Sequence, residues 1–196
     1  MVYAEPHIKN YVKFVDKLFD KSKTENIGII YFVSNNSTKN KLLPKSILNY
    51  YKIHIKSHHD GKIIYINNNK KYNECIVLYG KNEYKNISLN FGSLISSKIE
   101  NGSWKIFNKI TNKSLREFLI GWGLDQYRFN KLIVNKRIIV ADDFNILEIK
   151  NNLSAIFYGK ELINIPATDM GPNALEKSFI NFADYHNAEI NIIKGS

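Results

Sequence analysis

Residues 159–172 have the sequence Gly-Lys-Glu-Leu-Ile-Asn-Ile-Pro-Ala-Thr-Asp-Met-Gly-Pro, which predicts the end of one helix and the start of another. Pro166 has no amide hydrogen and disfavours the α conformation at the residue before it, so we expect the first helix to end near Asn164. Pro172 suits the first position of a new helix, with Gly171 as its N-cap. The stretch therefore predicts a hinge between two helices.

Beyond this hinge the chain carries an apolar stripe and then an alternating segment. Leu175, Phe179, Phe182 and Ala183 recur at helical spacing, which predicts a helix with one apolar face. Residues 188–193 alternate between apolar and polar side chains and predict a strand. A helix followed by a lone strand is half of an alternating α/β unit, and the remaining residues cannot supply its partners. We therefore expect an incomplete helix–strand unit here.

Upstream of the hinge, strand patterns are interleaved with helix patterns. We expect strands at 27–33, 63–66, 75–79 and 104–107, and helices at 89–99, 115–129 and 143–163. A polar turn at 67–71 joins the second and third strands in a hairpin, whereas residues 8–19 fit either a strand or a helix, and 138–140 either a strand or a helix lead-in. Ser114 is expected to cap helix 115–129, and Asp142 or Asp143 the long helix. The predicted fold class is α/β, a sheet covered by helices.

Two segments carry motif residues in the same order. Residues 118–129 are similar to the pattern Gly-Trp-x-Leu-Gly-x-Tyr-x-Phe through Gly121, Trp122, Tyr127 and Phe129. Residues 160–172 are similar to the pattern Arg-Asp-Leu-(Val/Ile)-Asn-Thr-Pro-x-Asn-Asp-Met-Gly-Pro, with matches at Leu162, Ile163, Asn164, Pro166, Asp169, Met170, Gly171 and Pro172, and departures at Lys160, Glu161, Ile165 and Thr168. Together the two segments resemble the leucyl (cytosol) aminopeptidases, which are two-metal exopeptidases.

The resemblance implies a domain organisation. Residues 1–141 would form an N-terminal α/β domain with a macro-like mixed sheet, residues 142–165 a linker helix, and residues 166–196 the truncated beginning of the catalytic domain. The motif residues Gly121, Trp122, Tyr127, Phe129, Asn164, Pro166, Asp169, Gly171 and Pro172 would be structural or linker residues. They would position a catalytic domain and would not catalyse.

The resemblance also implies what this segment cannot do alone. The parent enzyme would use two divalent metals, Mn or Zn, to release amino-terminal residues from peptide substrates, and would assemble as a homohexamer. The motifs that supply its metal ligands, Gly-Lys-Gly-x-Thr-Phe-Asp and Asn-Thr-Asp-Ala-Glu-Gly-Arg, have no match here, so no catalytic or metal-binding residue can be assigned. We therefore expect an inactive segment that binds no cofactor and is a monomer or weak oligomer.

The charge distribution suggests a second hypothesis, a basic nucleic-acid-binding module. Residues 1–113 hold 19 lysines and eight acidic residues, a net charge of +11, whereas residues 114–196 have a net charge of −1. Against this hypothesis, all three arginines, Arg116, Arg128 and Arg137, lie outside the basic part, although arginine is preferred for bidentate phosphate and base contacts. The scattered lysines are typical of a solvated surface encoded by an AT-rich genome.

Other residues admit a chemical and a structural interpretation. His54, His58, His59 and Asp60 could bind a metal, but adjacent histidines on a strand face opposite sides, which favours a loop. Cys75, inside an apolar strand, is expected to be a buried core residue. Asp142 and Asp143 are explained by helix capping. Trp122, Tyr127 and Phe129 could stack on bases, yet their helical spacing favours the core, and Gly121 and Gly123 are expected to permit close packing.

The sequence also bears on cellular location and on a third functional hypothesis. The sequence has no apolar run near the ~18 residues of a transmembrane helix and no apolar core of a signal peptide at its start. A single cysteine fits a reducing compartment, so we expect a cytoplasmic protein without a membrane association. The macro-like fold by analogy suggests an ADP-ribose or nucleotide-binding domain, which is the third hypothesis.

Overall fold

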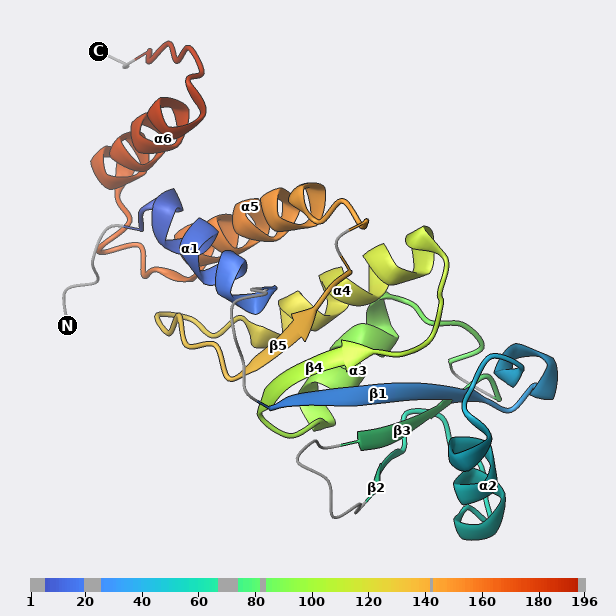
Figure 1. Cartoon of the computed structure of the whole chain (residues 1–196). Coiled ribbons are helices and arrows are strands. Elements are labelled where there is room, and N and C mark those ends of the chain that lie inside the picture. The colour runs from blue at the N-terminus through green and yellow to red at the C-terminus, as the bar shows by residue number, and fades with distance from the viewer. Residues whose placement is uncertain (1–5, 20–25, 67–73, 82–83, 142, 194–196) are drawn as a thin grey trace.

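A five-stranded mixed sheet forms the centre of the molecule (Figure 1). The computed structural model describes residues 6–19, 26–66, 74–81, 84–141 and 143–193. In chain order the strands are β1 (Ile27–Ser34), β2 (Ile63–Ile66), β3 (Glu74–Tyr79), β4 (Gly102–Ile106) and β5 (Lys136–Ile139), and in space their order is β2-β3-β1-β4-β5. β2 is antiparallel to β3, and the other neighbours are parallel. The predicted α/β class and the antiparallel pairing of 63–66 with 75–79 are confirmed, while the turn at 67–71 lies outside the described residues.

Helices cover both faces of this sheet, which explains why its central strands are almost continuously apolar. The helices are α1 (Ile8–Leu18), α2 (Lys45–His54), α3 (Leu89–Lys98), α4 (Asn112–Gln126), α5 (Leu147–Asn164) and α6 (Pro172–His186), with a short 3-10 helix η1 (Ser37–Asn40). Ile30 and Phe32 of β1 point into a core shared with α1, α3, α4 and α5. Tyr31 and Val33 point to the opposite face, where Ile47 of α2 is buried.

Two helix starts differ from the sequence-based prediction. Helix α4 begins three residues earlier than expected because Thr111, not Ser114, is its N-cap, and the Thr111 hydroxyl accepts a hydrogen bond from the Ser114 amide at 3.2 Å. Helix α5 begins at Leu147 with Ile146 at the N-cap position, so Asp143 lies three residues too early to cap it, and Asp142 lies outside the described residues. The Asn145 side chain accepts from the Leu147 amide instead. The two ambiguous segments are settled as helix α1 and strand β5.

The hinge has the predicted form, but the strand after it is absent. Helix α5 ends at Asn164, and α6 begins at Pro172 with Gly171 as its N-cap, as expected. Asn187 ends α6 in the left-handed conformation, and no residue of the described segment 188–193 belongs to a strand. The predicted strand is therefore wrong in this structure. Its alternating pattern is real, but a strand forms only where a neighbour supplies backbone partners.

Helix α5 is part of the core as well as the connection to the hinge. Its residues Ile149, Leu153 and Phe157 are buried, and the Phe157 ring lies 5.7 Å from the ring of Phe14 on α1. Figure 1 shows α1 and α5 side by side at one side of the sheet, whereas α6 projects from the far end of α5, away from the strands. The chain before the hinge therefore packs as one body, to which α6 is attached at one end.

Candidate functional site

The two motif segments meet in space at the buried carboxylate of Glu161. The Tyr127 hydroxyl donates to Oε2 of Glu161 at 2.8 Å, and the backbone amide of Asn130 donates to its Oε1 at 3.1 Å. Asn164 in turn donates from Nδ2 to the Tyr127 hydroxyl at 3.1 Å. Glu161 is only 6% exposed. We call Tyr127, Glu161 and Asn164 the hinge network, because it joins the end of α4 to the last turn of α5.

The ring of Tyr127 contributes packing to the same place. It stacks on Phe157 with ring centroids 5.5 Å apart, and the ammonium group of Lys160 lies 5.1 Å from its ring centre. Burial raises the pKa of Tyr127 to about 12, with a further increase from the hydrogen bond to Glu161 and its charge, although the hydrogen bond from Asn164 acts in the opposite direction. Burial and the charge of Glu161 also raise the pKa of Tyr11 on α1. The Tyr127 hydroxyl is therefore protonated at neutral pH and donates to Glu161.

The glycines of the first motif permit a close helix crossing. A Cβ atom on Gly121 would overlap the backbone carbonyl of Leu89, and one on Gly92 of α3 would overlap the carbonyl of Phe118. Gly123 lies against the side chain of Leu153 on α5. The backbones of α3 and α4 thus touch at this crossing, which is the packing role that the sequence suggested for the glycines.

The aromatic residues of the first motif do not form an exposed stacking platform. Trp122 is fully buried, and its indole nitrogen has no hydrogen-bond partner among the residues that the structure describes. Tyr127 and Phe129 are half-buried. Because Trp122 is enclosed in the core and Tyr127 stacks on Phe157, these two side chains serve packing.

The second motif continues from the hinge network into a tight turn. The amides of Asp169 and Met170 both donate to the carbonyl of Pro166 at 2.9 Å. Helix α6 is then attached through Tyr158 of α5, whose hydroxyl donates to the Ser178 carbonyl at 2.7 Å and whose ring stacks on Phe182 at 5.5 Å. Pro166, Asp169, Gly171 and Pro172 therefore set the path of the chain from α5 into α6.

The outer face of α6 is apolar and open. Leu175 and Phe179 of α6, with Ile190, Ile192 and Ile193 after it, line a hollow of about 630 Å³, and Phe179 is 51% exposed. The predicted apolar stripe is thus divided, because Ala183 is buried while Leu175 and Phe179 are exposed. We call Leu175, Phe179, Ile190, Ile192 and Ile193 the outer apolar face.

The histidine and cysteine candidates have structural surroundings. Nε2 of His58 donates to the Tyr79 carbonyl at 2.9 Å, and its Nδ1 is hydrogen-bonded to the Tyr51 hydroxyl at 2.9 Å. The Asp60 carboxylate accepts from the Lys81 amide at 3.0 Å and so holds the loop after β3. Cys75 is buried in the core, which raises its pKa. Within the described ranges no group of three or more His, Cys, Asp or Glu side chains could hold a metal ion, so these residues do not fit the two metals that the resemblance implies.

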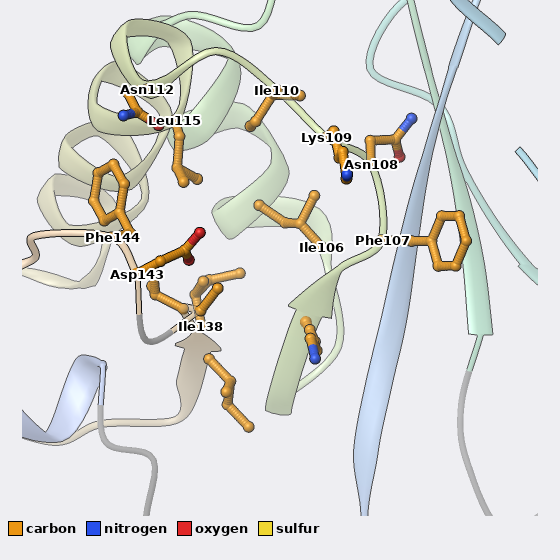
Figure 2. A pocket seen from close by; sticks show the side chains of 14 residues that line it. Ile106, Phe107, Asn108, Lys109, Ile110, Asn112, Leu115, Ile138, Asp143 and Phe144 are labelled. Carbon is orange, nitrogen blue, oxygen red and sulfur yellow. The ribbon is translucent and has the colours of Figure 1, made fainter. Parts of the chain in front are cut away.

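The carboxyl end of the sheet offers the other candidate region. Asn108 accepts from the Phe32 amide at 2.7 Å and donates to the Phe32 carbonyl at 2.9 Å, and Asn40 makes the same pair with the amide and carbonyl of Ser34. These amides occupy the backbone of β1 at the point where the connections after β1 and β4 diverge, the usual ligand position in open α/β sheets. A cavity of about 520 Å³ remains beside it, at the ends of β4 and β5 (Figure 2).

Known structures share this architecture. No protein-family model matches the sequence, and no curated protein matches it either. The crystal structure of a cytosol aminopeptidase from Coxiella burnetii superposes with a TM-score of 0.67 at 20% identity, over 89% of this chain and 39% of that one. The chain shares its fold with part of a cytosol aminopeptidase. An M17 aminopeptidase from Trypanosoma brucei matches with a TM-score of 0.50 at 6% identity, over 91% of this chain and 43% of that one.

The chain therefore spans about two fifths of the length of either aminopeptidase. At these identities the likeness establishes the fold. The residue that sequence reasoning undervalued is Glu161, which appeared only as a departure from the Asp of the motif. Its signal was a charged residue within the apolar run of a helix, seven residues after the buried Ser154 and three before Asn164.

Proposed function

We propose that this chain is the non-catalytic N-terminal part of a leucyl aminopeptidase, comprising an accessory α/β domain, a connecting helix and the entrance to the catalytic domain. The parent enzyme would release amino-terminal residues from peptides with two divalent metals, Mn or Zn, supplied with ligands from outside the described residues. When bound, such metals would supply Lewis-acid chemistry to peptide hydrolysis in that enzyme. In this chain, the residues from Tyr127 to Pro172 would hold and aim the catalytic domain.

The hinge network is the observation that carries this proposal. Two segments 30 or more residues apart were matched to the same family from sequence, and Tyr127, Glu161 and Asn164 join them by direct hydrogen bonds. A pairing of two chance matches would not require such contacts. The shared fold with the Coxiella burnetii enzyme supports the proposal independently, because it extends over 89% of the chain.

The outer apolar face supports the same proposal. Its exposed side chains lie directly after the motif residues Gly171 and Pro172, where the resemblance places the beginning of the catalytic domain. Exposed apolar patches of this kind mark surfaces that pack against further protein. Three further properties are part of the proposal. The parent enzyme would assemble as a homohexamer, it would be located in the cytoplasm, and the sheet of the N-terminal domain would be macro-like. No described helix is both long and apolar enough to cross a bilayer.

The proposal is tested by assaying the purified chain with leucine p-nitroanilide in the presence of Mn²⁺. We expect no turnover above the blank, because residues 1–196 contain neither metal-ligand motif. Turnover that co-purifies with the chain and disappears with a chelator would overturn the accessory-domain role.

A second test distinguishes an accessory domain from an unrelated protein with a similar fold. The reading frame after codon 196 should encode the Gly-Lys-Gly-x-Thr-Phe-Asp and Asn-Thr-Asp-Ala-Glu-Gly-Arg motifs within about 200 residues, a typical domain length. A frame without either motif would contradict the proposed parent enzyme, whatever the outcome of the activity assay.

A further inference from the structure

The cavity at the carboxyl ends of β4 and β5 has two polar sides and an apolar floor. Figure 2 shows Asp143 and Phe144 on one side and Asn108 and Lys109 on the other, with Ile106 and Ile110 between them. Its volume of about 520 Å³ lies in the range of roughly 300–1,000 Å³ that is usual for small-molecule sites. Leu115 and Ile138 extend the apolar lining.

The start of helix α5 explains why an acidic side chain faces this cavity. Asp143 has the position and charge of a helix cap in the sequence, but α5 begins only at Leu147 with Ile146 as its N-cap. The carboxylate is therefore not used at the helix terminus, and its side chain points toward the space between Phe144 and Ile106 (Figure 2). The cavity lining therefore holds the Asp143 carboxylate together with two lysines, Lys105 and Lys109.

We propose that this cavity binds a short apolar peptide with free ends, a dipeptide in the simplest case. Asp143 would pair with the peptide's ammonium group, Lys109 with its carboxylate, and the apolar lining would take its side chains. An extended dipeptide spans about 7 Å, and charge-assisted pairs at both ends give it an orientation. The inference goes beyond the proposed function and does not depend on it, because it uses only the chemistry of this cavity.

The same features disfavour a nucleotide at this place. Asp143 repels phosphate, whereas Lys105 and Lys109 of the same lining attract it, so charge alone does not favour a nucleotide. The described residues that line the cavity also include no glycine that would let backbone amides approach a phosphate closely. The neighbouring backbone of β1, which would otherwise offer such amides, is bonded to Asn108 and Asn40. A zwitterion with an apolar body matches these surroundings better than a polyanion does.

The test is a titration of the ¹⁵N-labelled full chain with leucyl-leucine, followed by amide shifts of the residues that line the cavity. We expect a Kd on the order of 0.1–1 mM, as for a ligand of this size. N-acetyl-leucyl-leucine lacks the ammonium group and leucyl-leucinamide lacks the carboxylate, and each should bind about tenfold more weakly. Mass spectrometry of the peptide after the titration separates binding from hydrolysis.

Two variants assign the ends of the peptide. Asp143→Asn should weaken leucyl-leucine and remove the effect of acetylation, and Lys109→Gln should remove the effect of amidation. Asp184→Asn on α6 and Lys52→Gln on α2 are matched controls with exposed side chains, and they should leave binding unchanged. No shifts at about 10 mM peptide, equal binding of the acetylated peptide, or tighter binding of ADP-ribose in the cavity would each overturn the proposal.

Discussion

The crossing of α3 and α4 and the attachment of α6 are opposite solutions to helix packing in one chain. At the crossing, Gly92 and Gly121 bring two backbones into contact, and the neighbouring Trp122 and Phe118 are fully buried. Helix α6 instead rests on Tyr158 and Phe182 with one side, while Phe179 and, after the helix, Ile193 at 91% exposure face outward. The first interface is complete within the chain, and the second leaves apolar surface uncovered.

The difference shows which helix faces are buried by other parts of the chain and which remain exposed. Segments that resemble motifs of one family fall on both regions, yet in the first they fill a core and in the second they lead to an open surface. The hinge network lies between these two regions, and its hydrogen bonds join the end of α4 to the last turn of α5. Mutations should therefore have large effects at the crossing, intermediate effects at the hinge network and small effects on the outer apolar face.

The largest effect is expected for Gly121→Ala. The added methyl group would overlap the Leu89 carbonyl, and backbone cannot move aside as a side chain can, so we expect a loss of about 3 kcal/mol or more in the free energy of unfolding. Gly159→Ala on α5 is the matched control, because no atom lies within 4 Å of its added Cβ. It should stabilise the helix by about 0.5–1 kcal/mol. Urea unfolding measures both, and similar losses in the two variants would refute the close crossing.

The hinge network should come next. Glu161→Gln keeps the shape of the side chain but removes a buried charged acceptor for Tyr127 and Asn130, so unfolding should cost about 1–3 kcal/mol less. Glu148→Gln removes an exposed carboxylate that pairs with Arg116 and should change stability by no more than about 0.5 kcal/mol. Equal changes in the free energy of unfolding for the two substitutions would mean that the buried carboxylate stabilises the fold no more than an exposed one does.

The same network predicts an alkaline weakness. The pKa of Tyr127 is about 12 in the folded chain against 10.0 ordinarily, and Tyr31 is raised to about 12 by burial and by Glu74. The unfolded chain therefore loses these two protons at a lower pH than the folded chain does. The contribution of the two tyrosines to the free energy of unfolding is fully present below pH 10 and falls as the pH rises from about 10 to 12. Tyr127→Phe should make that fall shallower, as followed by urea midpoints across the range. An unchanged slope in this variant would show that Tyr127 titrates normally.

The sequence was informative where local chemistry decides the structure. Pro166 and Pro172 define the two sides of the hinge in the structure as they did in the sequence, and the apolar runs of β1 and β3 form the centre of the sheet. Helix starts were less predictable, because Ser114, Thr111, Asp143 and Asn145 can all cap and only the backbone path selects among them. Residues 188–193 have a strand pattern, but pairing depends on a neighbour that local sequence does not reveal.

For the candidate site, too, the sequence predicts some features and not others. The motif residues could be located from sequence, and their packing role followed for the glycines. That Glu161 is the acceptor for Tyr127 depends on how α4 and α5 cross, a contact 34 residues apart in the chain. The cavity at β4 and β5 could not be anticipated, since Asp143 lines it in a structure where α5 begins at Leu147 and not at residue 143 as predicted.

The smallest effect is expected on the outer apolar face. Phe179→Ser removes a side chain that is half exposed, so the free energy of unfolding should change by no more than about 0.5 kcal/mol. Self-association at high concentration should decrease, as measured by sedimentation velocity, because less apolar surface is available. Phe182→Ser, on the attached side of the same helix, should be clearly more destabilising. Equal losses in both variants would mean that α6 is packed on all sides.

Amide hydrogen exchange of the whole chain tests the central contrast most directly. We expect α3, α4 and α5 up to Asn164 to exchange near the rate of global unfolding. Helix α6 with residues 188–193 should exchange at least about 100-fold faster, because no other part of the described chain covers the outer apolar face. Slow exchange in α6, equal to that of α3 and α4, would contradict the account. It would show that α6 is packed as tightly as the helices of the core.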